Sequence, residues 1–181
     1  MQIRETGLPG LRLLSPKVFR DHRGFFLETF REEFFRSLDE PVHFVQDNHA
    51  RSEEAGVLRG LHYQAPPAAQ TKLVWVSRGA AFDVAVDMRR SSPAYGKSCS
   101  FVLTADNFLR LLIPKGFAHG YMTLEPGTEF HYKVDYYYSP EHEGGLRWND
   151  PALAIDWPQR EPIMAGRDAH WPLLADLPAI F

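Results

Sequence analysis

The sequence is poor in cysteine, and Cys99 is the only one among its 181 residues. A single cysteine excludes an internal disulfide framework and any zinc site built from several thiolates, and it favours a reducing compartment. Long apolar runs are missing too, since no segment approaches the roughly 18 residues that a membrane-spanning helix requires. The first five residues lack the apolar core of a signal peptide. These absences predict a cytoplasmic protein with no membrane partner.

An excess of charge of either sign is also absent. The chain has 20 basic and 23 acidic residues, for a net charge of −3. Nucleic-acid-binding domains usually carry a basic excess, so we expect no nucleic-acid partner. With 44% hydrophobic and 24% charged residues, the composition excludes disorder and fits a folded core. The length predicts one domain over residues 1–181.

Helical periodicity is scarce, and short apolar stretches separated by proline and glycine dominate the chain. Only Glu32–Leu38 and the stretch after Ala165 look helical. Many short strands with regular turn signals predict an antiparallel sandwich or barrel. An all-β jelly-roll barrel, with short helices near the N-terminal third and at the C-terminus, fits the length best. We expect strands over Gly24–Arg31, His43–Ser52, Val57–Tyr63, Lys72–Ser77, Gly79–Met88, Ser98–Thr104, Leu109–Ile113, His119–Leu124 and Thr128–Tyr138.

The stretch Gly79–Met88 alternates most clearly, and both of its faces are expected to be mostly buried. One face carries apolar side chains, and the other carries alanines together with Asp83 and Asp87. Asp83 has two equally weighted interpretations, in a polar cavity or on a solvent-facing strand. Asp87 lies beside Arg89, and here we expect an ordinary solvent-facing aspartate.

Several polar side chains fall on predicted strands rather than on the loops between them. Strand residues two apart point the same way, so Gln46 and Asn48 are expected to present adjacent amides to one ligand. Inward positions of a small barrel usually hold apolar side chains, so inward polar ones need a ligand or water. The other candidates of this kind are Arg23, Glu28, Arg59, His62, Lys72, His119, Tyr132 and Tyr138.

Histidines on a jelly roll often bind a metal, and cupin metal sites combine two histidine motifs. The second motif resembles Pro-x-Gly-x-x-His, present here as Pro114, Gly116 and His119. The first would read His-x-His, but the residue two places after His62 is Gln64. A firm site usually takes three or more protein ligands. The sequence therefore predicts the cupin turn without a metal.

The remaining chemistry is acid–base chemistry. A histidine such as His62 titrates near neutrality, a lysine stabilises a developing oxyanion, and a tyrosine returns a proton. This combination suits proton abstraction next to a ketone. Each residue also has an ordinary structural interpretation, as a satisfied histidine, a solvated lysine or a packed tyrosine. Spacing alone supports only a β-barrel with a polar pocket.

The ordered series of motifs resembles the nucleotide-sugar epimerases typified by dTDP-4-dehydrorhamnose 3,5-epimerase. The resemblance runs nearly end to end, and no single motif carries it. It includes DHRGFFLE (21–28), QDNHARS (46–52), GVLRGLHYQ (56–64), QTKLV (70–74), IPKGFAHG (113–120), WNDP (148–151) and IDWP (155–158).

The resemblance implies roles for individual residues. His62 is similar to the base that removes a proton beside the 4-keto group of the sugar, and Asp168 to the carboxylate paired with it. Lys72 would stabilise the enolate oxygen, Tyr132 would deliver a proton from the opposite face, and Tyr138 would stack on thymine. The other positions that hold the nucleotide sugar in this family are Arg23, Glu28, Gln46, Asp47, Asn48, Arg59, His119, Glu143 and Arg167.

The same resemblance implies a cupin-fold homodimer that needs no metal or organic cofactor. The implied reaction converts dTDP-4-dehydro-6-deoxy-D-glucose to dTDP-4-dehydro-L-rhamnose by inverting carbons 3 and 5. The C-terminal motif departs from the usual Leu-Ser-x-Lys-Asp, because it has Ala165 and Arg167 in place of serine and lysine. Three alternatives stay open: a single-centre epimerase, a non-catalytic nucleotide-sugar-binding cupin and, more distantly, a metal-dependent cupin oxygenase.

Overall fold

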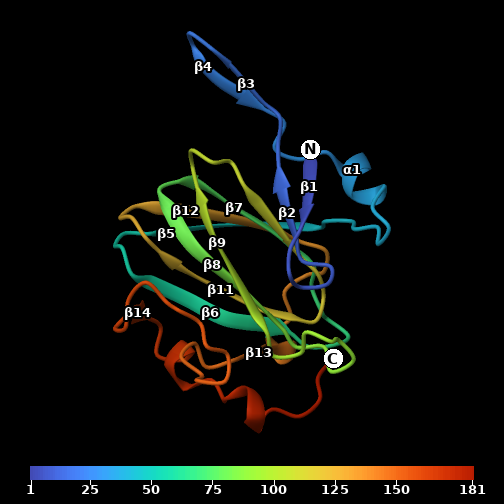
Figure 1. Cartoon of the computed structure of the whole chain (residues 1–181), viewed down its shortest axis with the longest axis vertical. Coiled ribbons are helices and arrows are strands. Elements are labelled where there is room, and N and C mark those ends of the chain that lie inside the picture. Colours follow the sequence, from blue (N-terminus) through green and yellow to red (C-terminus); the bar gives the residue numbers. More distant parts are fainter.

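The computed structural model describes residues 1–181, and strands dominate it (Figure 1). There are fourteen strands, one short α-helix, and three 3-10 helices: η1 (Pro140–His142), η2 (Asp168–His170) and η3 (Leu174–Asp176). The prediction of an all-β jelly roll of cupin type with few short helices is confirmed. No helix in the structure has both the length and the apolar character needed to cross a membrane.

Two large sheets make up the body of the molecule. The first has the order β1 (Gln2–Glu5), β2 (Arg12–Ser15), β10 (Arg110–Ile113), β7 (Lys72–Arg78), β12 (Thr128–Val134) and β5 (Gln46–Ser52). The second has the order β13 (Glu143–Gly145), β6 (Val57–Gln64), β11 (Phe117–Thr123), β8 (Ala80–Asp87) and β9 (Ser98–Thr104), with β14 (Ile163–Met164) parallel to β6. All other neighbouring strands are antiparallel.

A separate hairpin and one helix complete the fold. Strands β3 (Val18–Asp21) and β4 (Gly24–Leu27) pair only with each other and project away from the two sheets (Figure 1). Helix α1 (Glu32–Arg36) covers the outer face of the first sheet, where Phe35 packs on Leu14, Leu73 and Leu112. The predicted helix after Ala165 consists of the 3-10 helices η2 and η3.

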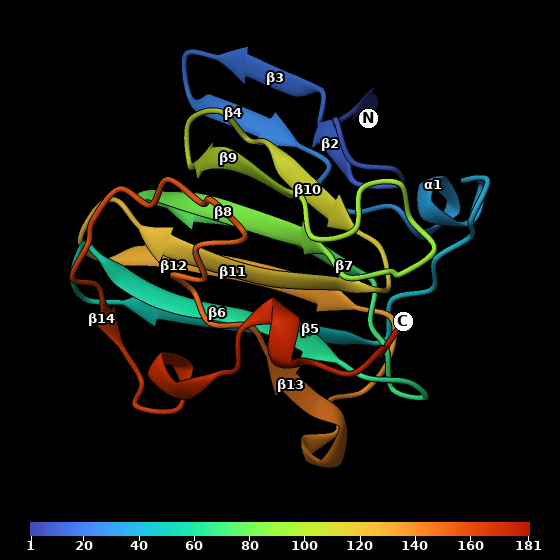
Figure 2. The ribbon, with the colours of Figure 1, turned by 60° about the horizontal axis from the view of Figure 1, so that its bottom comes forward.

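The period-2 pattern of β8 explains how the layers pack. Ala81 and Ala85 face the first sheet and share a core with Val74 and Phe130. The opposite face of β8 packs with residues of the C-terminal segment, including Leu146. Figure 2 shows this segment, in orange and red, running beside β6 and β13. Both faces of β8 are therefore buried, as the alternation predicts.

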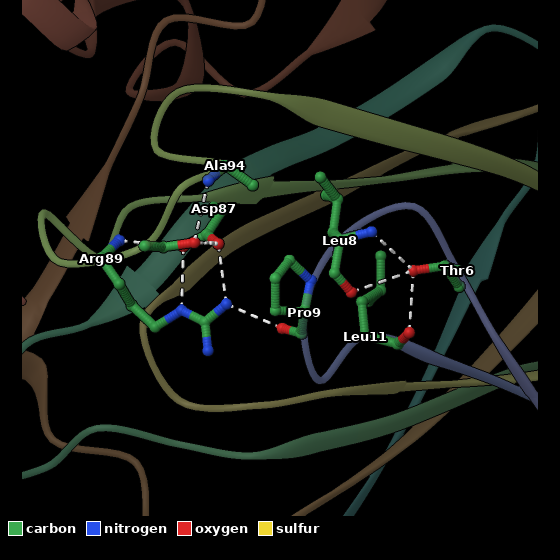
Figure 3. A network of polar contacts seen from close by, with 8 residues as sticks. Thr6, Leu8, Pro9, Leu11, Asp87, Arg89 and Ala94 are labelled. Carbon is green, nitrogen blue, oxygen red and sulfur yellow. Dashed lines mark hydrogen bonds and ion pairs between the residues drawn. The ribbon is translucent and has the colours of Figure 1, made fainter.

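The prediction that Asp87 faces solvent is wrong, because its side chain is fully buried. Its carboxylate accepts hydrogen bonds from the backbone N–H and guanidinium of Arg89 and from the Ser92 hydroxyl, and Arg89 also donates to the carbonyl of Pro9 (Figure 3). Burial alone would raise the pKa of Asp87, but these hydrogen bonds outweigh it and hold the pKa below its usual value. The network joins the N-terminal loop to the end of β8.

Replacing Asp87 tests this network. Asp87→Asn is expected to lower the free energy of unfolding by about 2–4 kcal/mol at pH 7, because it leaves the Arg89 guanidinium without its counter-charge. Since the folded pKa of Asp87 is depressed, its stabilisation is present above the unfolded value of 3.8 and is lost as the pH falls through the folded pKa. Urea titrations of wild type and variant should therefore converge in acid, whereas the exposed Asp106→Asn change should have little effect at any pH.

Candidate active site

The two sheets and the C-terminal segment enclose a cavity of about 570 Å³. The first sheet contributes walls from β5, β7 and β12, the second from β6 and β11, and residues 163–168 close one side. Eleven of the fourteen predicted site residues line this cavity: Gln46, Asn48, Arg59, His62, Lys72, His119, Tyr132, Tyr138, Glu143, Arg167 and Asp168.

His62 and Asp168 form a hydrogen-bonded pair in the wall of the cavity. His62 Nε2, on β6, lies 2.8 Å from Oδ1 of Asp168, the first residue of η2. The side chain of Asp168 is only 4% exposed. Burial would raise its pKa, but the bonds to His62, the Gly60 N–H and Trp171 hold the pKa below its usual value. An ionised carboxylate requires Nε2 to carry the hydrogen, so Nδ1 of His62 holds the lone pair of a base.

Glycine lets β6 and β11 approach closely beside this pair. Gly60 has a positive φ of 132°, and a Cβ there would lie 2.5 Å from Cα of Gly120. The backbone N–H of Gly60 donates to Asp168 Oδ2 over 3.3 Å. A side chain at position 60 would therefore disturb both the strand contact and the support of Asp168.

Lys72 faces the same cavity from β7 of the opposite sheet. Burial lowers the pKa of Lys72 from 10.5 to about 8, and the nearby carboxylates of Asp83 and Glu143 oppose that shift. The amine is therefore still mostly an ammonium at pH 7. It supplies a cation, poorly shielded by water, inside the cavity.

Asp83 belongs to the polar interior, which decides between its two interpretations. His119 Nε2 lies 2.9 Å from Asp83 Oδ2, and both side chains are buried. His119 is also paired directly with His62 across the ladder between β11 and β6. Asp83 therefore anchors one lining histidine and, through its charge, favours the protonated form of Lys72.

Tyr132 lies on β12, in the sheet opposite the one that carries His62. Burial raises the pKa of the Tyr132 phenol above its usual value, so the hydroxyl keeps its proton at neutral pH. The cavity thus has the His62 imidazole on one sheet and a protonated phenol on the other.

The open end of the cavity carries a second cluster. The Tyr138 hydroxyl donates to Glu143 Oε2 over 3.0 Å, and Arg167 binds the same oxygen at 2.8 Å. The amides of Gln46 and Asn48 lie on one face of β5 and are hydrogen-bonded to each other, as their spacing predicts. Tyr138 is 49% exposed.

Three predicted binding residues lie outside this cavity. Arg23 is on the projecting hairpin and pairs with Asp21, and Glu28 follows the hairpin and pairs with Arg31. Asp47 points to the outer face of β5, where its carboxylate binds Lys133. Within one chain, these residues are not brought together with the other eleven.

The sequence analysis missed two residues at the site, Tyr121 and Trp171. Tyr121 lines the cavity, is stacked on Phe130 with centroids 3.8 Å apart, and has a buried hydroxyl without a partner. Trp171 donates its indole N–H to Asp168. The inward alternation of β11 could have indicated Tyr121, whereas no periodicity covers the turn that holds Trp171.

A possible metal-binding cluster exists elsewhere on the surface. It consists of His49, Glu129 and His131, whose ligand atoms lie within 4.8 Å of one another. These residues alternate with the cavity-lining residues of β5 and β12, so they occupy the outer face of the first sheet. His131 Nε2 is bonded to the Ser77 hydroxyl, and the imidazoles of His49 and His131 are stacked on each other.

Comparison with known proteins decides the family. The family model for dTDP-4-dehydrorhamnose 3,5-epimerase matches residues 5–176. The chain belongs to this family. The resemblance inferred from the motifs is thus confirmed, and so is the class of the protein, an isomerase.

Relatives with this name match almost the whole chain. An Escherichia coli dTDP-4-dehydrorhamnose 3,5-epimerase is 51% identical over 91% of this chain and 89% of its own. The crystal structure of the Bacillus anthracis epimerase with TDP and PPi bound is 48% identical, with a TM-score of 0.92 over 95% of this chain and 98% of that one. The Legionella pneumophila epimerase in complex with dTDP-4-keto-L-rhamnose is 43% identical, with a TM-score of 0.93 over 98% of this chain and 95% of that one.

The electrostatic link between Asp83 and Lys72 is open to measurement. Asp83→Asn removes a negative charge that favours the ammonium, so the pKa of Lys72 should fall below about 8. Titration of the lysine ε-carbon by NMR measures this directly. Asp47→Asn is the matched control, since Asp47 binds Lys133 on the outer face. An unchanged Lys72 titration in Asp83→Asn would contradict the link.

Proposed function

We propose that this protein inverts carbons 3 and 5 of dTDP-4-dehydro-6-deoxy-D-glucose and yields dTDP-4-dehydro-L-rhamnose. One observation carries the proposal: His62, Lys72 and Tyr132 line a single cavity, with the base and the acid on different sheets. Residues 1–181 would act as one epimerase domain. The lone cysteine favours a cytoplasmic setting.

Each inversion consists of a deprotonation and a reprotonation. The 4-keto group acidifies the neighbouring C–H bonds, and Nδ1 of His62 takes the proton while the electron pair moves onto the keto oxygen. The Lys72 ammonium stabilises the enolate oxygen. The Tyr132 hydroxyl then donates a proton to the same carbon from the opposite face, and the keto group re-forms. Tyr132 regains its proton from solvent and His62 loses one, so the cycle is balanced.

The remaining residues that line the cavity are suited to binding a nucleoside diphosphate. Tyr138 offers an exposed ring for stacking on the base, beside the amides of Gln46 and Asn48. Arg59 and Arg167 are cations at the cavity and suit the phosphates. The nucleotide end would therefore lie near β5 and Tyr138, with the sugar between His62 and Tyr132.

The decisive test is turnover in deuterated water. Purified protein with the dTDP-4-keto sugar should yield the rhamnose-configured product with deuterium at both carbons, followed by NMR. Label at one carbon would instead indicate a single-centre epimerase. His62→Asn should lower kcat by about 100- to 10,000-fold, because the base is lost. If that variant retains wild-type turnover, His62 is not the base, and if the wild type shows no exchange, a non-catalytic binder is favoured.

We further propose that the protein is a homodimer in which the hairpin of one subunit completes the cavity of the other. The hairpin exposes Phe19, Phe25 and Phe26, whose exposed fractions are 51%, 57% and 69%. Such a patch on a projecting element is typical of an interaction surface. Arg23 and Glu28 at this hairpin would then reach the partner's nucleotide instead of their own.

Mixing two inactive variants tests this arrangement. Arg23→Ala lacks a hairpin contact and His62→Asn lacks the base, so each homodimer should be weak or inactive. In a mixed dimer one cavity combines an intact His62 with an intact partner hairpin. Refolding an equal mixture should therefore restore about a quarter of wild-type activity, because half the dimers are mixed and each has one complete site. No restoration despite subunit exchange would contradict the shared site.

A further inference from the structure

Trp171 lies directly beside the pair formed by His62 and Asp168. Its indole Nε1–H donates to Asp168 Oδ1 over 3.3 Å, and the same oxygen accepts from His62 Nε2 at 2.8 Å. The rings of Trp171 and His62 also meet edge to face, with centroids 6.1 Å apart and an interplanar angle of 75°. One side chain thus contacts both members of the pair.

The indole of Trp171 is held firmly in this place. A Cβ on Gly145 would lie 2.5 Å from the indole ring, so only glycine at this position of β13 leaves room for it. Arg147 donates from its side chain to the Trp171 carbonyl over 3.1 Å and from its backbone to the Pro172 carbonyl over 2.9 Å. The N–H of Trp171 is therefore fixed in space relative to Asp168.

Few other groups could restrain the carboxylate of Asp168. Ala165 lines the cavity on the same segment but has no donor in its side chain. Arg167 uses its guanidinium on Glu143 and comes only within 3.7 Å of Asp168 Oδ1. Besides His62, the close donors are the backbone N–H of Gly60 and the indole of Trp171.

We propose that Trp171 is a positioning residue for the epimerisation: its indole N–H orients the Asp168 carboxylate and limits how strongly that carboxylate holds the proton of His62. The inference rests on the proposed role of His62 as the base. A carboxylate that accepts a hydrogen bond from a fixed neutral donor interacts less strongly with an imidazolium. The base thus loses its captured proton more readily.

Trp171→Phe removes the donor and keeps an aromatic ring. We expect the His62–Asp168 pair to take up its proton at a pH about half a unit higher than in wild type, because the ionised carboxylate has lost one hydrogen bond. The ring resonances of His62 report this midpoint by NMR without any substrate. The acid limb of the pH profile of kcat/KM should move to higher pH by the same amount. The plateau value of kcat/KM should fall by no more than about tenfold.

The substitution changes none of the other charged and titratable groups that line the cavity with the pair. They are Arg59 and Tyr63 of β6, Lys72 of β7, His119 and Tyr121 of β11, Tyr132 of β12, Tyr138, Glu143 of β13 and, next to Asp168, Arg167. A shift of the midpoint is therefore attributable to the indole N–H.

Trp157→Phe is the matched control. The Trp157 indole N–H donates to the carbonyl of Trp148 over 2.8 Å and has no contact with the pair, so the midpoint and the acid limb should not move. In an Asp168→Asn background, Trp171→Phe should add no further shift, because its effect passes through the carboxylate. The ¹⁵N indole resonance of Trp171 in the wild type needs no variant and should titrate together with His62.

The outcomes separate this inference from the proposed function. The role of Trp171 is overturned if its indole resonance does not change as His62 titrates. It is also overturned if Trp171→Phe leaves the titration midpoint of the pair unchanged, even where the activity falls. If Trp171→Phe moves the titration midpoint of the pair but not the acid limb of the kcat/KM profile, Trp171 still acts on the pair. That outcome contradicts the role of His62 as the base.

Discussion

The hydrogen bond between His62 and Asp168 is the constraint on which the site depends. It joins β6 to a 3-10 helix 106 residues later in the chain, so the site exists only when the C-terminal segment is docked. Docking is driven by apolar contacts, as Leu146, Leu153 and Leu174 pack against the outer face of the second sheet. Burial of these leucines thus brings the Asp168 carboxylate to β6, where it forms a hydrogen bond with His62.

A buried carboxylate is stable there only because donors surround it. The cost of removing Asp168 from water is offset by a ring N–H, a backbone N–H and an indole N–H. The same principle governs Asp87, whose partners are Arg89 and Ser92, whereas Asp83 is bound by His119 through one oxygen and its buried Oδ1 has no partner. Asp168 differs from Asp87 because its partners include a histidine whose Nδ1 is not bonded to the carboxylate, whereas Asp87 is bound by Arg89 and Ser92.

Local pattern and resemblance predicted different parts of this protein. Alternation predicted the strand Ser98–Thr104 with its bounds and the shared face of Gln46 and Asn48, because side-chain direction in a strand depends only on parity. It did not predict strands β1, β2, β3, β13 and β14, which have two to four residues each. The burial of Asp87 was also missed, because a sequence does not reveal that a flanking arginine will fold back over its neighbour.

The resemblance assigned fourteen residues to a ligand, and eleven line one cavity of the chain. A motif match identifies which residues bind a ligand. It does not show whether a residue binds the ligand in its own subunit or in another one. Arg23 and Glu28 lie on or beside a hairpin that pairs with neither sheet, exposes three phenylalanines and contacts the rest of the chain at Phe108. An isolated hairpin of two short strands is only marginally stable in water, and within the chain Phe25 and Arg20 support this one by their contacts with Phe108. In the homodimer that we propose, a second copy of the chain would support the hairpin and would receive Arg23 as a further cation beside its cavity.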